Sequence, residues 1–201
     1  MNTLALYFRH MPLTLVLIGV SVLMSLLSSF GDNTKVLAPF LISIYPNGGL
    51  PEIRGGELWR LLTPIFIHFG YLHIIFNMLW TWDLGRALEL TQGTRRLAVL
   101  VVVLGIAGNL VEYAWTGWVL FGGMSGVVYG LLGYIWIQGR LDPASPLRLH
   151  REIVILMVIW YVLGWTGFIG PIANMAHTGG LVGGLVLGWL YSPRKDLRRL
   201  F

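Results

Sequence analysis

Long apolar stretches alternate along this chain with short segments that are polar or rich in glycine and proline. Six of the apolar stretches have the composition of membrane-spanning helices, and their lengths equal or fall slightly below the length that crosses a membrane. They cover residues 12–30, 71–90, 97–115, 125–139, 153–167 and 172–191. Between the first two, Pro39, Pro46 and Pro51 break a segment that is still apolar enough to lie against a membrane. We therefore expect an all-α, polytopic bundle of six transmembrane helices with a membrane-associated first loop, forming one domain over residues 1–201.

The composition favours the same class of protein. Hydrophobic residues make up 56% of the chain and charged residues only 11%, whereas about 25% of residues are charged in a typical soluble domain. The mean hydropathy is +0.72. The net charge of +5 does not indicate nucleic-acid binding, because the basic residues are scattered at the ends of the predicted spans. The chain has no cysteine, which excludes disulfides and thiol chemistry.

The basic residues also predict which side of the membrane each loop occupies. Six spans place both termini on one side, and that side holds eleven of the 14 Lys and Arg residues: Arg9, Arg86, Arg95, Arg96, Arg140, Arg148, Arg151, Arg194, Lys195, Arg198 and Arg199. The other side holds Lys35, Arg54 and Arg60. The positive-inside rule makes the side with the surplus cytoplasmic. The fourth span then begins at the opposite face, towards the periplasm or exterior.

The fourth predicted span opens with a serine between glycines, in the run Gly123-Met124-Ser125-Gly126. If Arg140 marks the cytoplasmic surface, about 15 residues of helix reach only about 23 Å, whereas the hydrocarbon core is about 30 Å thick. A helix that starts below the surface leaves N–H groups without partners, which a membrane tolerates only beside protein or water. The stretch therefore predicts a hydrated pocket that holds Ser125, although small residues also suit plain helix packing.

A serine hydroxyl becomes an effective nucleophile when a base takes its proton, and His177 is the best candidate for that base. It lies about one turn into the sixth predicted span, at nearly the depth of Ser125. Both helices carry small residues at regular spacing, which would let them approach closely. These residues are Gly180, Gly184 and Gly188 on the sixth span and Gly126, Gly130 and Gly133 on the fourth. The alternative is a histidine that only hydrogen-bonds to a nearby carbonyl.

Two further polar side chains, His73 and Asn77, stand four residues apart on the second predicted span and therefore share one face. Both can donate hydrogen bonds while neutral, as the oxyanion formed by attack on an amide requires. Together with the backbone N–H of Ser125 they would form an oxyanion hole. The alternative is that they only join helices, since Asn and His also hydrogen-bond across membrane helices.

No acidic residue is well placed to complete a catalytic triad. Asp83 and Glu89 lie near the cytoplasmic end of the second predicted span, at the wrong depth. Glu112 lies nearer the outer side, on a helix whose placement relative to His177 the sequence leaves open. We therefore expect a Ser–His dyad, with Tyr129, one turn after the serine, supporting the imidazole ring.

Several segments match the pattern of one protein family, in the family's order, over about Glu57 to Trp189. They are Glu57-Leu58-Trp59-Arg60; His68; His73-Ile74-Ile75-Phe76-Asn77; Gly123-Met124-Ser125-Gly126 with Tyr129; and Ala173-Asn174-Met175-Ala176-His177 followed by Gly180 and Gly184. By these motifs the chain resembles the rhomboid family of intramembrane serine proteases, in particular its compact six-span bacterial members. Only about eleven residues precede the first span, so we expect no soluble cytoplasmic domain of the kind that some relatives carry.

The resemblance implies a role for each matching residue. Ser125 would be the nucleophile and His177 the general base. His73 and Asn77 would bind the oxyanion together with the Ser125 N–H, and Tyr129 would pack against the base. Supporting or structural roles would fall to His68, Gly123, Gly126, Glu57, Arg60 and Glu89.

The expected function is an intramembrane serine endopeptidase that cleaves transmembrane or juxtamembrane segments of other membrane proteins, without a cofactor, a metal or an obligate partner. Its place would be the cell (inner) membrane, with both termini cytoplasmic. A rhomboid specialised for processing protein-sorting tails and a non-catalytic relative that only binds membrane proteins are alternatives. A metalloprotease built on His68, His73 and His177 lacks the H-E-x-x-H motif, and a transporter would show inverted repeats, which we do not find.

Overall fold

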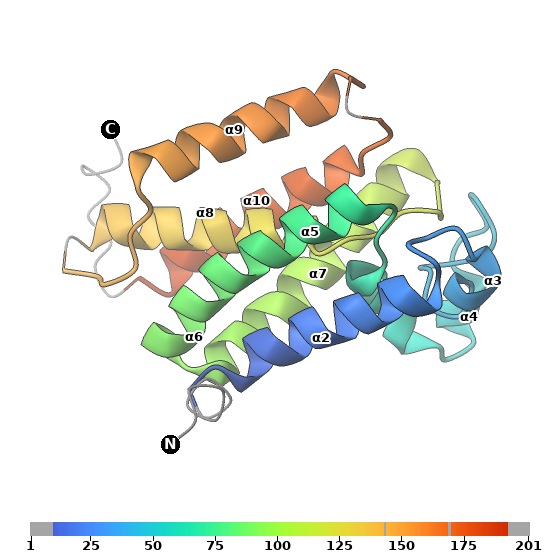
Figure 1. Cartoon of the computed structure of the whole chain (residues 1–201), viewed down its shortest axis with the longest axis horizontal. Helices are drawn as coiled ribbons and strands as arrows, with labels where there is room; N and C mark the ends of the chain where they lie inside the picture. Colours follow the sequence, from blue (N-terminus) through green and yellow to red (C-terminus); the bar gives the residue numbers. More distant parts are fainter. Residues whose placement is uncertain (1–9, 143, 169, 193–201) are drawn as a thin grey trace.

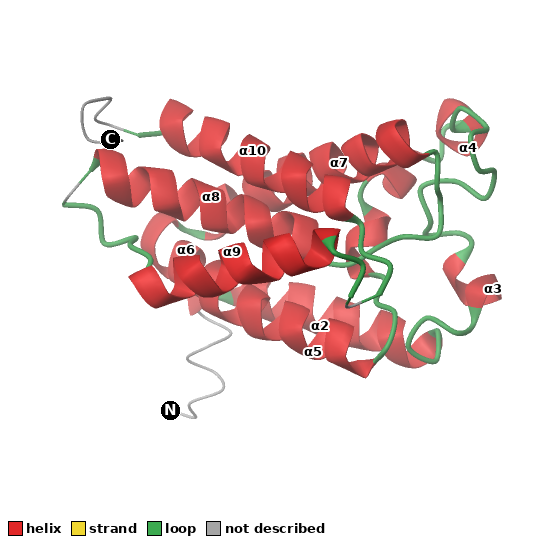
Figure 2. Cartoon of the chain, turned by 90° about the horizontal axis from the view of Figure 1, so that it is seen from above, coloured by secondary structure: helices red, strands yellow, loops and turns green. Residues whose placement is uncertain are grey.

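A computed structural model of the chain describes residues 10–142, 144–168 and 170–192. Every regular element within these residues is a helix (Figures 1 and 2), which confirms the predicted all-α class. The long helices lie alongside one another, and the short helices α3 and α4 are both at the same end of the bundle (Figures 1 and 2). Arg9 and the basic tail, which contribute to the predicted topology, lie outside the described residues.

Helices occupy all six apolar stretches noted in the sequence. Their bounds are α2 Pro12–Leu27; α5 Tyr71–Trp80, which continues through the π-helical turn η3 Thr81–Gly85 into α6 Arg86–Gln92; α7 Thr94–Thr116; α8 Ser125–Leu141; α9 Arg151–Trp165; and α10 Asn174–Leu190. The first helix is shorter than the predicted 12–30, because Ser29 and Phe30 take left-handed backbone with φ of 52° and 57°. The other predicted ends differ from the observed ends by a few residues.

One of the described helices, α7, is long and apolar enough by itself to cross a membrane, with 23 residues. Helix α2 is apolar but shorter, and α8, α9 and α10 have 17, 15 and 17 residues. The count of six membrane crossings therefore remains a prediction.

Helix α8 is the central helix of the bundle, and 13 of its 17 residues are buried. Helix α10 packs along it at backbone distance. A Cβ on Gly180 would collide with the carbonyl oxygen of Gly126, and a Cβ on Gly184 with that of Gly130. The two glycine faces noted in the sequence therefore meet. This contact fixes the depth of α10 against α8, and with it the positions of the side chains at the two helix starts.

The first loop, residues 31–66, is folded into short helical turns. They are α3 Thr34–Leu37, α4 Pro51–Arg54, η1 Leu58–Leu61 and η2 Thr63–Phe66. The loop lies at the end of the bundle opposite α6 (Figures 1 and 2). The pattern of prolines and glycines thus marks a compact cap at one end of the helices.

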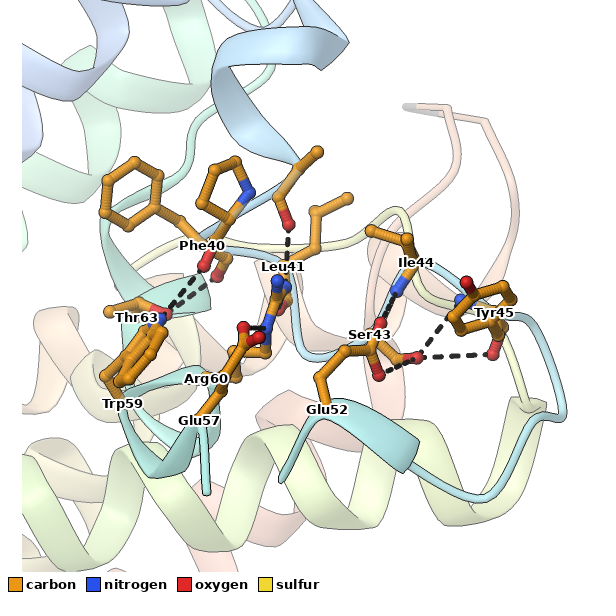
Figure 3. Close-up of polar contacts among 12 residues, drawn as sticks. Phe40, Leu41, Ser43, Ile44, Tyr45, Glu52, Glu57, Trp59, Arg60 and Thr63 are labelled. Atoms are coloured by element: carbon orange, nitrogen blue, oxygen red, sulfur yellow. Dashed lines mark hydrogen bonds and ion pairs between the residues drawn. The ribbon is translucent and has the colours of Figure 1, made fainter. Parts of the chain in front are cut away.

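Arg60 holds this loop together from its interior (Figure 3). The Arg60 guanidinium is buried and pairs with the Glu57 carboxylate at 2.6 Å. Its Nη1 donates to the carbonyl oxygens of Ala38 at 2.7 Å and Leu41 at 2.9 Å. A buried cation is stable only when its donors are paired, so these contacts agree with the structural role that the resemblance implies for Arg60 and Glu57.

Glu89 ties the helices together at the opposite end of the bundle. Its buried carboxylate accepts the backbone N–H groups of Leu13 at 2.9 Å and Thr14 at 2.8 Å. It also accepts the hydroxyls of Thr14 at 2.7 Å and Thr94 at 2.8 Å. One carboxylate on α6 therefore binds the starts of both α2 and α7.

Candidate active site

Ser125 is the first residue of α8, and His177 lies in the first turn of α10. The close contact between these helices brings the two side chains together, and His177 Nε2 lies 2.7 Å from Ser125 Oγ. This is a hydrogen bond of the length that a general base needs to take a hydroxyl proton. His177 is 8% exposed and Ser125 is partly exposed. The imidazole is thus shielded from solvent, and Ser125 is the more accessible residue of the pair.

The loop before Ser125 takes a backbone conformation that requires glycine. Gly123 has a φ of +119°, and a Cβ at this position would lie 2.7 Å from His73 Nε2. The Gly123 N–H donates to the carbonyl oxygen of Pro64 at 3.0 Å. The loop is therefore bonded to the segment before α5 and presents the serine beside His73.

His68 supports the same loop from behind. It is fully buried, and its Nε2 accepts the N–H of Met124, the residue before Ser125, at 3.4 Å. Its Nδ1 lies 3.1 Å from the carbonyl oxygen of Phe66, to which it donates when Nε2 is the acceptor. His68 therefore contacts the backbone on both sides of its ring and has no contact with the serine hydroxyl, which fits a supporting position.

His73, on α5, directs one ring nitrogen towards the serine loop. Its Nδ1 accepts the N–H of Phe69 at 3.2 Å, so the hydrogen of the neutral ring is on Nε2. A Cβ built on Gly123 would lie 2.7 Å from this nitrogen and 3.6 Å from Ser125 Oγ. The Nε2–H of His73 therefore lies on the same side of Gly123 as the Ser125 hydroxyl.

Asn77 lies one turn after His73 on the same helix and is 5% exposed. Its Nδ2 donates one hydrogen to the carbonyl oxygen of His73 at 2.8 Å. The second hydrogen on Nδ2 remains available, and Oδ1 has no partner among the described residues. The amide is therefore only partly used by the fold.

Tyr129 packs against the imidazole of His177, with ring centroids 4.8 Å apart and ring planes at 38°. The Tyr129 hydroxyl donates to the carbonyl oxygen of Met157 on α9 at 3.1 Å. The Tyr129 side chain is therefore attached to α8 through its backbone and to α9 through its hydroxyl. His177 Nδ1 has no hydrogen-bond partner within residues 10–142, 144–168 and 170–192. Over those residues the imidazole of His177 contacts the Ser125 hydroxyl and the Tyr129 ring, and no carboxylate hydrogen-bonds to it.

Two polar contacts that hold α9 beside the site were not found by sequence reasoning. The hydroxyls of Tyr161 on α9 and Thr178 on α10 lie 2.7 Å apart. The Asn174 amide donates to the carbonyl oxygen of Gly164 at 3.0 Å. Each pair joins different helices, so no spacing within one helix could have revealed it.

The rings of His68 and His73 lie edge to face with centroids 5.1 Å apart, but the ring nitrogens of the three histidines near the site have different partners. His68 contacts backbone groups, His73 binds the Phe69 N–H, and His177 contacts Ser125. In the part of the chain that the structure describes, no three His, Cys, Asp or Glu side chains are grouped so that they could hold a metal ion.

Comparison with known proteins places the chain in a family. A model of the rhomboid domain matches residues 55–194. The chain belongs to the rhomboid family. Similar proteins include Rhomboid protease GlpG of Salmonella choleraesuis (strain SC-B67), which is 37% identical over 185 residues, and the proteins of the same name from Salmonella typhi and Salmonella newport (strain SL254), each 36% identical. The alignments cover 90% of this rhomboid chain and 64% of each relative.

Rhomboid-family proteins are polytopic membrane proteins, and the surface of this rhomboid chain agrees with a lipid environment. Helix α9 exposes a row of large aliphatic side chains, each between 44% and 55% exposed: Ile155, Leu156, Val158, Ile159 and Val162. A soluble monomer rarely exposes so continuous an apolar surface. In a bilayer the same surface faces hydrocarbon.

Proposed function

We propose that this chain is an intramembrane serine endopeptidase that cleaves transmembrane or juxtamembrane segments of other membrane proteins. The observation that carries the proposal is the 2.7 Å hydrogen bond between His177 Nε2 and Ser125 Oγ. Relatives that carry the name rhomboid protease support the same activity. A family member that only binds membrane proteins has no need for a hydroxyl and an imidazole at this distance, so the contact favours catalysis.

In the proposed reaction, Ser125 Oγ attacks the carbonyl carbon of the scissile peptide bond while its proton passes to His177 Nε2. The carbonyl oxygen becomes negative and accepts hydrogen bonds from His73 Nε2–H, the second amide hydrogen of Asn77 and the Ser125 N–H, which has no acceptor within α8. When the C–N bond breaks, His177 gives the proton to the leaving amine. Water then attacks the acyl-serine with help from the same base, which releases the new carboxylate and restores Ser125.

The base in this mechanism is oriented by packing. Because His177 Nε2 accepts the serine proton, the hydrogen of the neutral ring is on Nδ1. Tyr129 covers the ring and is itself fixed to α9 through Met157. We therefore propose that Tyr129 keeps the imidazole at the angle at which Nε2 faces Ser125.

We further propose six membrane crossings with both termini in the cytoplasm, so that Ser125 lies below the outer face of the inner membrane. The 17 residues of α8 support this depth, because they reach only about 26 Å in a hydrocarbon core of about 30 Å. A helical substrate hides its amides in its own hydrogen bonds, so the segment to be cut must unwind. Glycine or proline near the cleavage site would make unwinding easier.

The first test concerns the nucleophile. A fluorophosphonate probe should label the wild-type protein at Ser125, and the protein in liposomes should cleave a transmembrane substrate. The Ser125→Ala variant should lose both properties with little change in melting temperature, because it removes one partly exposed hydroxyl. Ser21→Ala, which alters a buried serine on α2, is the control and should keep both.

Two results would contradict the proposal. One is labelling and cleavage that survive Ser125→Ala. The other is loss of cleavage on addition of a zinc chelator to a protein in which no serine is labelled, which would indicate a metal-dependent enzyme.

A further inference from the structure

The start of α10 needs hydrogen-bond acceptors from elsewhere in the molecule. The residue before the helix is Ala173, whose methyl side chain cannot accept a hydrogen bond. Asn174, the first residue of the helix, uses its amide to donate to the carbonyl oxygen of Gly164. The first N–H groups of any α-helix lack partners within the helix, and in α10 they lie directly before His177.

Two of these N–H groups, those of Met175 and Ala176, donate to the same oxygen atom. The acceptor is Oε2 of Glu112, at 3.0 Å from each nitrogen. Glu112 is 5% exposed and lies near the end of α7. The N–H groups on either side of this pair bind backbone carbonyls. A side chain from another helix therefore caps the helix that carries the proposed base.

The same turn of α10 is packed closely against two helices. A Cβ on Gly108 of α7 would lie 3.0 Å from the carbonyl oxygen of Ala176, and a Cβ on Gly126 of α8 would lie 3.2 Å from it. Glu112 adds a fixed polar contact at the N-terminal side of this turn. Because His177 directly follows Ala176, a shift of the turn changes the distance from Nε2 to Ser125 Oγ.

We propose that Glu112 is a positioning residue, whose Oε2 holds the first turn of α10 so that His177 Nε2 meets Ser125 Oγ. Its bonds go to the backbone N–H groups of α10 and not to the imidazole, and His177 Nδ1 has no partner among the described residues. Glu112 is therefore not the acid of a triad. The inference rests on the proposed serine-protease function.

Three substitutions test this role. Both bonds end on one oxygen atom, so the amide oxygen of Glu112→Gln can accept them and should retain most of kcat. Glu112→Met has a similar length without an oxygen, and should lower kcat by about 10- to 100-fold, the cost of misplacing a reacting group by about 1 Å. KM should change little, and the rate of fluorophosphonate labelling at Ser125 should fall in parallel with kcat. Glu112→Asp, whose shorter side chain reaches less far, should give an intermediate kcat.

Asn109→Ala is the matched control. Asn109 is buried on the same helix, but its Nδ2 donates to the carbonyl oxygen of Leu61 at 2.9 Å and not to α10. Its loss should lower the melting temperature while the folded enzyme keeps its kcat. The proposal is overturned if Glu112→Met also lowers only the melting temperature and keeps its kcat. It is likewise overturned if Glu112→Gln loses as much kcat as Glu112→Met. If Glu112→Met does not fold, a wild-type kcat in Glu112→Asp overturns it.

The labelling of the wild-type protein separates this inference from the proposed function. A wild-type protein that is not labelled at Ser125 overturns the serine mechanism itself. A labelled wild-type protein whose Glu112→Met variant keeps its kcat overturns only the role of Glu112.

Discussion

Gly123 is required at the centre of the candidate site for two independent reasons. Its φ of +119° strains any residue with a Cβ, and the space that a Cβ would need is taken by His73 Nε2. The same closeness puts a neutral imidazole N–H beside Ser125. At the scale of single residues, the glycine run before the serine therefore reflects both the turn of the backbone and the approach of a donor.

The catalytic and helix-joining interpretations of His73 and Asn77 predict different kinetics. Removing one oxyanion donor typically costs about 10²–10³ in kcat, whereas a hydrogen bond between membrane helices contributes on average about 0.6 kcal/mol of stability. We expect His73→Ala to lower kcat by about 10²–10³. Asn77→Ala should also lower kcat, but by less than Ser125→Ala does, because His73 Nε2–H and the Ser125 N–H remain as donors. The double variant should be more severe than either.

The measurement is kcat and melting temperature for the three variants in one detergent. Ile75→Ala, which alters an exposed residue on the same helix, should leave kcat unchanged. If both single variants keep the wild-type kcat and only melt at lower temperature, His73 and Asn77 have a structural role and no part in oxyanion binding.

Among the elements, the first loop keeps its shape through side chains that bind its own backbone. The Glu52 carboxylate accepts the Ile44 N–H at 2.8 Å and the Ser43 hydroxyl at 2.8 Å (Figure 3). Burial raises the pKa of Glu52. The opposite effect is larger, because these hydrogen bonds, a bond from the Glu52 backbone N–H and the charge of Arg60 all lower the pKa, which lies below the ordinary value of 4.5. Ionised Glu52 therefore stabilises the folded loop.

The lowered pKa of Glu52 predicts how the stability of the protein changes in acid. A carboxyl whose pKa is depressed in the folded state contributes stability that is fully present above its unfolded pKa and is lost as the pH falls through its folded pKa. The melting temperature of the wild-type protein should exceed that of Glu52→Gln near neutral pH. The difference should shrink as the pH falls below 4.5 and then disappear.

The experiment is a pair of melting curves at each pH. Asp32→Asn, at an exposed carboxylate near the start of the same loop, is the control and should not reproduce this pH dependence. A difference between wild type and Glu52→Gln that is as large at about pH 2 as at neutral pH would show that the carboxylate charge is not its cause.

At the scale of the whole molecule, the two ends of the bundle are held by different means. At one end, the glycine contact between α8 and α10 and the folded first loop surround the candidate site. At the other end, Glu89 on α6 binds the starts of α2 and α7 through four hydrogen bonds. We therefore expect that the stability of the bundle and the chemistry of the site can be changed separately.

Glu89→Gln should lower stability without affecting the chemistry. The threonine hydroxyls can turn and accept from the new amide, but the backbone N–H groups of Leu13 and Thr14 cannot, so at least one buried donor loses its acceptor. We expect the free energy of unfolding to fall by about 1–3 kcal/mol, measured by reversible unfolding in detergent, with kcat of the folded enzyme unchanged. Glu152→Gln, at an exposed position on α9, should change neither. Reduced kcat in fully folded Glu89→Gln would connect this end of the bundle to the site.

The sequence alone determined the features that depend on neighbours along the chain. Apolar length placed the helices, because burial of a helix needs a run of apolar residues. Glycines spaced three or four apart on two stretches predicted the close contact of α8 and α10, and Ser125 and His177 stood out because polar groups at such depth are rare. The end of α2 was missed, because Ser29 and Phe30 take left-handed backbone without being glycine. The family motifs then added the roles expected of His73, Asn77 and Tyr129.

The tertiary structure alone decided which groups meet across helices. Glu112 and Met175 are 63 residues apart in the chain, and Tyr129 and Met157 are 28 apart, so no periodicity relates them. Whether a carboxylate on α7 faces the imidazole or the backbone of α10 depends on how the two helices are rotated and how deeply they pack. That is set by the sum of many glycine and apolar contacts along α7, α8 and α10, and so the cap at Glu112 becomes visible only when the helices are assembled.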